Sequence, residues 1–416
     1  MAADTSVHEG TSVDADTLLL ELVATPEGRA DPYPRYAALR AQAPVHRSAL
    51  GFWVVTRYDD CQAVLRDHRL GKDFSGAANA LGITEEQQAE QSAFRGDHSN
   101  MLFADPPDHT RLRGLANRAF TPRRVEALRP RVVALVDELL DGFEGDEVDV
   151  MSALAFPLPV TVIGEMLGVP REDRAQFQPL VRASTAVLEL SITPEALSAA
   201  TAASETMEKY FLDLVAERRA RPQDDLLSQL IEAEDRGDQL TEEELVSTAI
   251  LLFAAGFETT TSLIGNGLLA LLRHPDQLER LRRDRTLIRP AVEELLRYDS
   301  PVQVDARAVY EDLEVLGHPM EAGAAVLTLL GAANRDPARF TDPDRLDVGR
   351  SEGAPLSFGS GIHYCLGAAL ARLEGQIVFE RLLDRFSTME LLVDQPRHRD
   401  SLTLRGLVDL PVRFTV

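Results

Sequence analysis

Cysteine is nearly absent from this chain of 416 residues, which contains only Cys61 and Cys365. Two cysteines cannot build a disulfide framework, so the composition fits a protein of a reducing compartment. Basic residues are also few, because 43 Lys and Arg stand against 67 Asp and Glu and give a formal net charge of −24. Phosphate binding needs a basic face, so this balance disfavours nucleic acid as a partner.

The first residues lack the features of a targeting segment. Residues 1–17 are polar and acidic, without a basic region followed by an apolar stretch. We therefore expect neither a signal peptide nor a membrane anchor. We predict a disordered tail over residues 1–17 and a single domain over residues 18–416, in a soluble cytoplasmic protein.

Composition and periodicity indicate the fold class. Apolar residues make up 44% of the chain and charged residues 26%, which is ordinary for a large globular core. Helical periodicity dominates, and short β-like runs are scattered among turns instead of alternating with helices. The sequence predicts a mainly α fold with small β-sheets (α+β). The predicted helices include 34–42, 59–66, 111–120, 124–143, 290–298 and most of 151–221; the predicted strands are 51–56, 306–309, 313–315, 325–330 and 407–414.

The stretch from Leu245 to Leu272 is almost free of charge and is long enough to span a bilayer. Its middle, however, carries Glu258, Asn266 and several threonines, which are costly in contact with lipid. No second stretch of this kind occurs in the sequence. We therefore predict a long helix through the centre of a soluble domain, without a membrane as partner.

The most informative segment is the glycine-bracketed loop Phe358–Gly367, which is followed by a helix-forming run over Ala368–Glu380. Gly359 and Gly361 permit positive φ, so the backbone can pass close to a flat or bulky group. Cys365 falls at the start of the helix, where backbone N–H groups and the helix dipole lower the pKa of a thiol. From the residues alone, Cys365 is a metal ligand, a nucleophile or a buried structural cysteine in a turn. A nucleophile needs a base and an orienting group.

The pattern Phe-x-x-Gly-x-His-x-Cys-x-Gly resembles the heme-binding loop of the cytochrome P450 monooxygenases. The resemblance implies the cytochrome P450 fold, with a long central helix over heme b and Cys365 as the axial thiolate on the iron. It also implies that His363 donates to a heme propionate, that Phe358 packs beside the sulfur and that Gly367 lets the next helix lie close under the porphyrin. Together with Gly359, these residues are the predicted cofactor-binding part of the loop. A nucleophilic Cys365 with His363 as base stays open, although no cysteine-protease signature accompanies it.

The central stretch contains Ala255-Gly256-Phe257-Glu258-Thr259-Thr260, which resembles the oxygen-activation motif of the same family. Gly256, next to Ala255, would remove a side chain where O₂ and substrate approach. The Thr259 hydroxyl can bond a helix carbonyl one turn back or turn towards oxygen, and Glu258 would be the acid of a proton relay. The alternative is a Gly/Thr cluster that only kinks a buried helix, with Glu258 ion-paired elsewhere.

Three further basic residues stand where the resemblance implies clamps for the heme propionates. His109 and Arg113 are four residues apart and share a helix face. Arg307 follows Pro301 in a short β-like run. Each of them, considered singly, is also compatible with a solvated surface charge.

Glu294 and Arg297 are spaced i, i+3 and so lie on one helix face. Without context this is a surface ion pair of little energetic weight. The resemblance implies instead a buried structural lock behind the thiolate loop. Arg345 is its predicted third member, with Arg350 as the alternative.

The resemblance extends over residues 31–416 and implies the soluble bacterial class of the family, as a monomer. No Gly-x-Gly-x-x-Gly follows a strand, so electrons from NAD(P)H would arrive through a separate ferredoxin reductase and ferredoxin. We expect ferredoxin to dock near Arg111, Arg350 and Arg372, where local positive potential would favour it.

The implied reaction is the insertion of one oxygen atom from O₂ into a hydrophobic small molecule, by hydroxylation or epoxidation, in secondary or xenobiotic metabolism. An atypical heme-thiolate reaction (peroxygenase, oxidative coupling) and a non-catalytic heme-binding protein are the alternatives. The intact pair of Glu258 and Thr259 favours a monooxygenase that uses O₂ and a reductase over both of these alternatives. The expected substrate walls are 75–100, 181–192, 254–255, 302–305 and 401–403, with Val302, Gln303, Val304, Asp305, Leu402 and Thr403 as candidate pocket residues.

Overall fold

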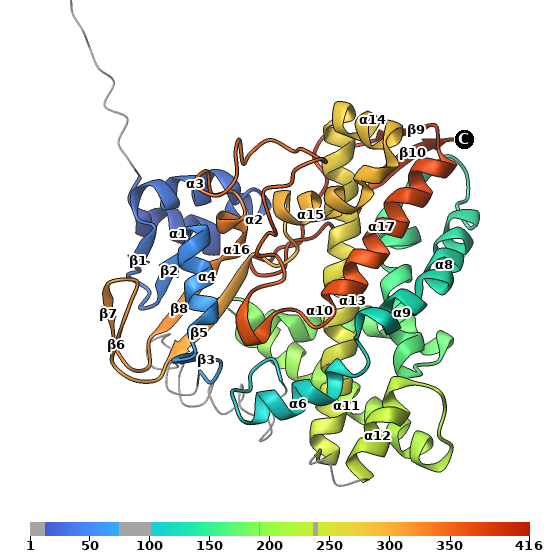
Figure 1. The fold of residues 1–416 in the computed structure, drawn as a ribbon, viewed down its shortest axis with the longest axis horizontal. Helices are drawn as coiled ribbons and strands as arrows, with labels where there is room; N and C mark the ends of the chain where they lie inside the picture. Colours follow the sequence, from blue (N-terminus) through green and yellow to red (C-terminus); the bar gives the residue numbers. More distant parts are fainter. Residues whose placement is uncertain (1–12, 75–100, 191, 236–239) are drawn as a thin grey trace, which may run out of the picture.

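The computed structural model describes residues 13–74, 101–190, 192–235 and 240–416. Most helices gather on one side of the molecule, and the largest sheet lies on the other (Figure 1). The prediction of a mainly α fold with small sheets is confirmed. The apolar faces of the helices meet in one large core cluster, and two smaller clusters lie around the sheet.

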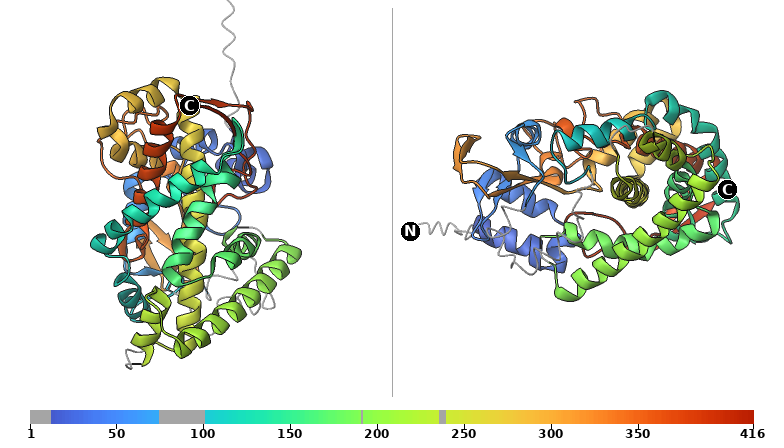
Figure 2. Two further views of the ribbon diagram at one scale, coloured as in Figure 1. Left: turned by 90° about the vertical axis from the view of Figure 1, so that its right-hand side faces the viewer. Right: turned by 90° about the horizontal axis from the view of Figure 1, so that it is seen from below.

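Helix α13, Glu242–Arg273, runs through the centre of the molecule, and the right-hand view of Figure 2 shows it nearly end-on. Its first turn is fixed by a capping box: the Thr241 hydroxyl accepts from the Glu244 amide at 3.2 Å, and the Glu244 carboxylate accepts from the Thr241 amide at 2.9 Å. In the described part of the chain it is the one helix long and apolar enough to cross a membrane. Its apolar window is 67% buried inside the protein, as expected for a core helix.

The other long helices surround α13 and bury their apolar faces against it. Helix α9 packs along one side of it, α15 and α17 along another, and α11 crosses below. The helical elements are α1 (Ala15–Ala24), α2 (Pro26–Ala30), α3 (Tyr33–Gln42), α4 (Tyr58–Arg66), α6 (Asp108–Asn117), α7 (Pro122–Ala127), α8 (Arg129–Asp141), η1 (Met151–Ala155), α9 (Pro157–Leu167), η2 (Arg171–Gln176), α10 (Phe177–Ser184), η3 (Thr185–Leu188), α11 (Pro194–Ala220), α12 (Leu226–Asp235), α14 (Pro275–Arg283), η4 (Arg285–Leu287), α15 (Ile288–Tyr298), α16 (Leu330–Ala333), η5 (Gly361–His363) and α17 (Ala368–Arg385).

Three small sheets join segments that are distant in the sequence. The largest has the strand order β1-β2-β8-β5-β3, in which β2 and β8 are parallel and the other pairs antiparallel. A second sheet has the order β4-β10-β9, and β6 and β7 form a hairpin. The strands are β1 (Val45–Arg47), β2 (Trp53–Val55), β3 (Leu70–Gly71), β4 (Glu147–Asp149), β5 (Val304–Val309), β6 (Leu313–Val315), β7 (His318–Met320), β8 (Ala325–Leu329), β9 (Thr388–Leu391) and β10 (Pro411–Thr415).

The predicted disordered tail over residues 1–17 extends too far along the chain, because its last residues belong to a helix. Helix α1 begins at Ala15, and the Asp14 carboxylate caps it by accepting from the Thr17 amide at 3.0 Å. Leu18 and Leu22 on this helix are buried in the cluster around α3. Residues 1–12 lie outside the described residues.

Candidate functional site

The loop before α17 has the backbone that its glycines predict. Gly359 and Gly361 have φ of 69° and 73°, in the left-handed region that favours glycine. A Cβ at Gly361 would lie 2.5 Å from the carbonyl oxygen of Leu65, so the loop passes directly against α4. The Cys365 amide donates to the Phe358 carbonyl at 2.9 Å and closes the loop around the thiol.

Cys365 is exposed to solvent as a residue, although many protein atoms lie around its sulfur. The loss of hydration raises its pKa, and this outweighs the amides of Gly367 and Ala368 and the charges of Arg113 and Arg372, which act in the opposite direction. The predicted lowering of the pKa is therefore wrong for the thiol by itself. Coordination to a metal ion would stabilise the thiolate form of Cys365, because a thiol that binds a metal ion is deprotonated.

Basic side chains from three distant segments converge beside this loop. The rings of His109 on α6 and His363 in η5 have centroids 4.2 Å apart, and Arg307 on β5 is only 2% exposed. Burial, followed by the charges of Lys72 and His109, lowers the pKa of His363 to about 3, so its imidazole is neutral. Arg113 is half-buried on α6, and its guanidinium donates to the Tyr364 carbonyl next to the cysteine.

These side chains have donors that the protein does not use. His109 Nε2, His363 Nε2 and Arg307 Nη2 are buried and find no hydrogen-bond partner among the described residues. Buried polar atoms in folded proteins are normally paired, so three orphaned nitrogens in one cluster fit an anionic group such as the two carboxylates of heme. A Cβ at Gly367 would meet no atom within 4 Å, which leaves room beside the cysteine. The residues present therefore fit a heme.

Lys72 belongs to the same cluster and was not predicted from the sequence. Its ammonium forms an ion pair with Asp305, and Arg307 Nη1 lies 3.0 Å from the other oxygen of that carboxylate. Burial alone would raise the pKa of Asp305, but Lys72 and then Arg307 outweigh it and hold the pKa well below its usual range. Asp305, predicted as a candidate pocket residue, is thus engaged by Lys72 and Arg307 and holds the basic cluster together. The one signal in the sequence was that Lys72 is one of only two lysines.

An accessible stripe runs along α13 at i, i+4 spacing. Leu251 and Thr259 are half-buried and Ala255 is exposed, whereas most of the neighbouring residues are buried. The Thr259 hydroxyl donates to the Ala255 carbonyl at 2.9 Å, which is the predicted bond one turn back. A Cβ at Gly256 would lie 3.0 Å from Ile163 of α9, which gives this glycine a packing role; its role beside O₂ stays a prediction. The glycine lets two helices approach each other.

Glu258 lies at the edge of this stripe and is only 2% exposed. Its carboxylate forms an ion pair with Arg399, and Arg182 Nε lies 3.9 Å from the same oxygen. The predicted relay acid is therefore held between two guanidinium groups. Arg182 and Arg399 lie far from Glu258 in the sequence, and neither carries a local motif that would have identified it.

The predicted lock is present, with a corrected third member. Arg297 Nε donates to Glu294 at 2.6 Å, and both side chains are about 1% exposed. Arg350 Nε donates to the same carboxylate at 3.0 Å, whereas Arg345 supplies only its backbone carbonyl, at 3.2 Å from Arg297 Nη2. The Arg297 guanidinium also donates to the carbonyls of Asn334 and Pro343 and so ties the loop after α16 to α15.

The three arginines predicted to attract ferredoxin are all neutralised by acidic partners. Arg111 pairs with Glu244 at 2.6 Å, and Arg372 pairs with Glu293. Arg350 belongs to the lock, where its side chain is 8% exposed. The structure thus does not support local positive potential from unpaired guanidinium groups at these positions.

Several predicted pocket residues point into the core. Val304 and Leu402 are buried in the cluster around α1 and α3, which contains no residue of α13, and Gln303 is buried where it donates to the Ser300 carbonyl at 2.7 Å. The Thr403 hydroxyl donates to the Leu188 carbonyl at 2.9 Å. Val302 is half-buried and forms a β-bridge with Leu404. The predicted wall over residues 75–100 lies outside the described residues.

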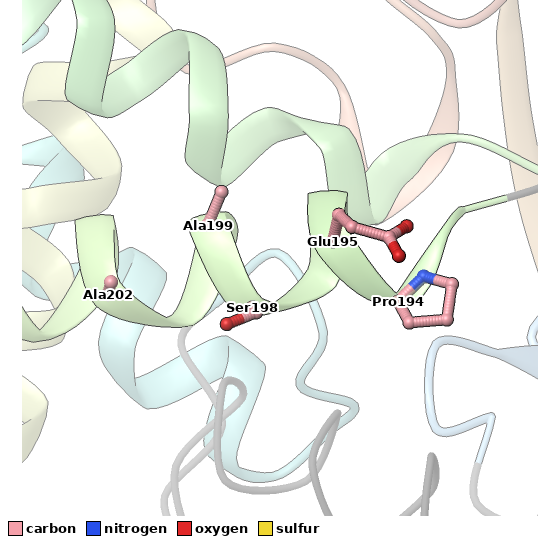
Figure 3. A pocket seen from close by; sticks show the side chains of 5 residues that line it. All are labelled: Pro194, Glu195, Ser198, Ala199 and Ala202. Carbon is pink, nitrogen blue, oxygen red and sulfur yellow. The ribbon is translucent and has the colours of Figure 1, made fainter.

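A shallow hollow of about 560 Å³ on the first turns of α11 is a different feature (Figure 3). All of its lining comes from one helix, it contains a single carboxylate, and it includes none of the residues around Cys365. The lining residues are Pro194, Glu195, Ser198, Ala199 and Ala202.

Comparison with known proteins agrees with this geometry. The family model of cytochrome P450 matches residues 49–416. Cytochrome P450 107B1 of Saccharopolyspora erythraea is 45% identical, over 92% of this chain and 95% of its own length. The vitamin D(3) 25-hydroxylase of Pseudonocardia autotrophica is 44% identical, over 92% of this chain and 93% of its own. The solved structure of P450BioI in complex with an acyl carrier protein ligated to hexadec-9Z-enoic acid has a TM-score of 0.87 at 40% identity, and covers 94% of this chain and 100% of that one.

Proposed function

Because the chain belongs to the cytochrome P450 family, we propose that Cys365 is the thiolate ligand of its heme iron and that α13 supplies the oxygen-activation residues. The chain is a heme-thiolate monooxygenase that acts on small molecules, with heme b, O₂ and electrons from a redox partner. Heme bound at this site supplies the iron that activates O₂, so that one oxygen atom enters the substrate and the other leaves as water.

The observation that carries the proposal is the set of orphaned donors beside the thiol. His109 and His363 offer Nε2, and Arg307 offers Nη2, in a buried cluster that lies next to the cysteine loop. Arg113 and Lys72 add positive charge to the same cluster. Charge-assisted hydrogen bonds from these groups would hold the two propionates and fix the orientation of the ring. The lock of Glu294, Arg297 and Arg350 supports the loop from behind.

Proton delivery is assigned to the stripe on α13. Thr259 holds a proton at Oγ1 and can exchange its bond to the Ala255 carbonyl for one to an oxygen atom beside it. Glu258 is adjacent in sequence, but its carboxylate is engaged by Arg399 and Arg182. It can pass a proton on only when one of these ion pairs opens.

The electron donor is proposed to be a ferredoxin with its reductase, because no Gly-x-Gly-x-x-Gly follows a strand in this sequence. A single catalytic domain that begins with α1, a monomeric state and a cytoplasmic location are part of the same proposal. Relatives named as a vitamin D(3) 25-hydroxylase and as a 6-deoxyerythronolide B hydroxylase support hydroxylation of a small hydrophobic molecule.

The deciding experiment is the absorption difference spectrum of the dithionite-reduced protein with and without carbon monoxide. A strongly red-shifted Soret band that disappears in Cys365→Ser is the expected result. A band typical of histidine-ligated heme in freshly folded protein would remove the thiolate assignment. Protein without any heme would reopen the nucleophilic cysteine.

A further inference from the structure

Two arginines flank the accessible stripe of α13 on the side of Glu258. Arg182 comes from α10, and Arg399 from the segment that leads to the β-bridge partner Leu407. Glu258 precedes Thr259 in sequence and is therefore about 100° from it around the helix, so its partners lie at the edge of the stripe. The Arg182 side chain is 35% exposed, so its guanidinium is accessible from outside the protein core.

Arg182 is less well paired than Arg399. Among the described residues, the one acidic group within ion-pair distance of Arg182 is Glu258, at 3.9 Å, and that carboxylate also pairs with Arg399. Arg182 Nε is buried and finds no hydrogen-bond acceptor among the same residues. Arg399 has a second acidic neighbour in Glu189, whose negative charge acts on it. The Glu189 carboxylate accepts from the Ser401 hydroxyl and from the amides of the two following residues.

Both guanidinium groups have lost part of their hydration. Burial lowers the pKa of Arg182, and burial followed by repulsion from Arg182 lowers the pKa of Arg399 to about 10. A buried charge without sufficient pairing destabilises a protein. A second anion at this position would compensate that cost, and the planar fork of a guanidinium is suited to a carboxylate.

We propose that Arg182 binds an acidic group of the substrate, so that the preferred substrates are apolar molecules that carry a carboxylate. This rests on the proposed function, because the apolar part must lie along Leu251 and Ala255 to bring a carbon atom to Thr259. The acid then fixes one end of the molecule at Arg182, and the distance from the acid to the oxidised carbon sets the regioselectivity. Glu258 and Arg399 serve as positioning residues for this anchor.

The test compares three probes of one chain length on the heme-loaded protein at pH 8: tetradecanoic acid, tetradecan-1-ol and methyl tetradecanoate. Each is titrated, and the shift of the Soret band on displacement of the water ligand gives its Kd. The acid should bind at least about tenfold more tightly than either neutral probe, as one charge-assisted contact predicts. In Arg182→Gln the acid should lose that advantage while the neutral probes keep their Kd. Arg182→Lys keeps the positive charge but not the planar guanidinium group, so it should retain part of the tighter binding of the acid.

Arg283→Gln is the matched control, because Arg283 is exposed on α14 and should leave all three Kd values unchanged. An acid that gives no shift, or that binds no better than the alcohol, overturns the inference. So does an Arg182→Gln variant that weakens all three probes alike, since Arg182 would then only neutralise Glu258. In each of these cases the carbon monoxide difference spectrum still shows whether Cys365 binds the heme iron. The substrate inference can therefore fail while the proposed function holds.

Discussion

Arg350 donates from Nε to both oxygens of Glu294, at 3.2 Å to Oε1 and 3.0 Å to Oε2, and so completes the lock behind the cysteine loop. We predict that Arg350→Ala destabilises the protein by about 3 kcal/mol, because it leaves a buried carboxylate with one cation fewer. Thermal unfolding and heme content of the purified protein measure this. Arg345→Ala is the control, since its side chain has no part in the lock, and equal losses in both variants would contradict the assignment.

Thr259 donates to the Ala255 carbonyl on the accessible face of α13. For any substrate that the wild type converts, we expect Thr259→Ala to lower the product formed per NADPH by about tenfold or more, because a positioned proton donor is lost. The missing reducing equivalents should be recovered as hydrogen peroxide. Thr201→Ala removes the same kind of i−4 bond from α11 and should leave the product yield unchanged. An unchanged yield in Thr259→Ala would contradict the relay.

Two glycines of the cysteine loop should respond differently to alanine. Gly361 has φ of 73°, and its Cβ would lie 2.5 Å from the Leu65 carbonyl oxygen, so Gly361→Ala should cost about 2 kcal/mol of stability. Gly367 has φ of −83° and open space beside it. Gly367→Ala should therefore fold normally but retain less heme. Heme content, measured against the yield of folded protein, separates the two, and normal heme content in Gly367→Ala would contradict the placement of the ring.

Glu374 on α17 is only 1% exposed, and its Oε2 has no partner among the described residues. Burial raises its pKa to about 8, from 4.5 for the free side chain. The folded protein therefore holds this proton more tightly than the unfolded chain, so stability from this group is complete below about pH 4.5 and is lost as the pH rises to 8. The loss is at most on the order of 5 kcal/mol.

Glu374→Gln removes the titration, and we expect it to stabilise the protein at pH 8 more than at pH 5. Thermal unfolding at the two pH values measures the difference. Glu380→Gln, at an exposed position of the same helix, should show no such dependence. A Glu374→Gln variant that is equally stabilised, or destabilised, at both pH values would show that the carboxyl is not buried in its neutral form.

The sequence predicted the parts of the site that are contiguous in the chain. The cysteine loop is specified by the ten residues 358–367 and the Thr259 segment of α13 by the six residues 255–260, so their local backbone follows from local chemistry. Asp305 could not be placed in the same way, because its partner Lys72 approaches from another strand of the sheet. The choice between Arg345 and Arg350 also depended on which side chain the loop turns inwards, and no local pattern decides that. Arg182 and Arg399 meet Glu258 only through the packing of three separate segments.

Strand β2 pairs in parallel with β8, so that Trp53 lies opposite Val326. On the ribosome, the hairpin of β1 and β2 is complete long before β8 has been synthesised, and until then β2 presents an unpaired edge. Such an edge can pair with other chains and leads to aggregation. Arg307, on β5, lies opposite Val326 of β8, and the basic cluster also includes His363, which comes later still in the chain. The basic cluster therefore forms late in biosynthesis, and the nascent protein cannot retain its prosthetic group until most of the chain has been translated.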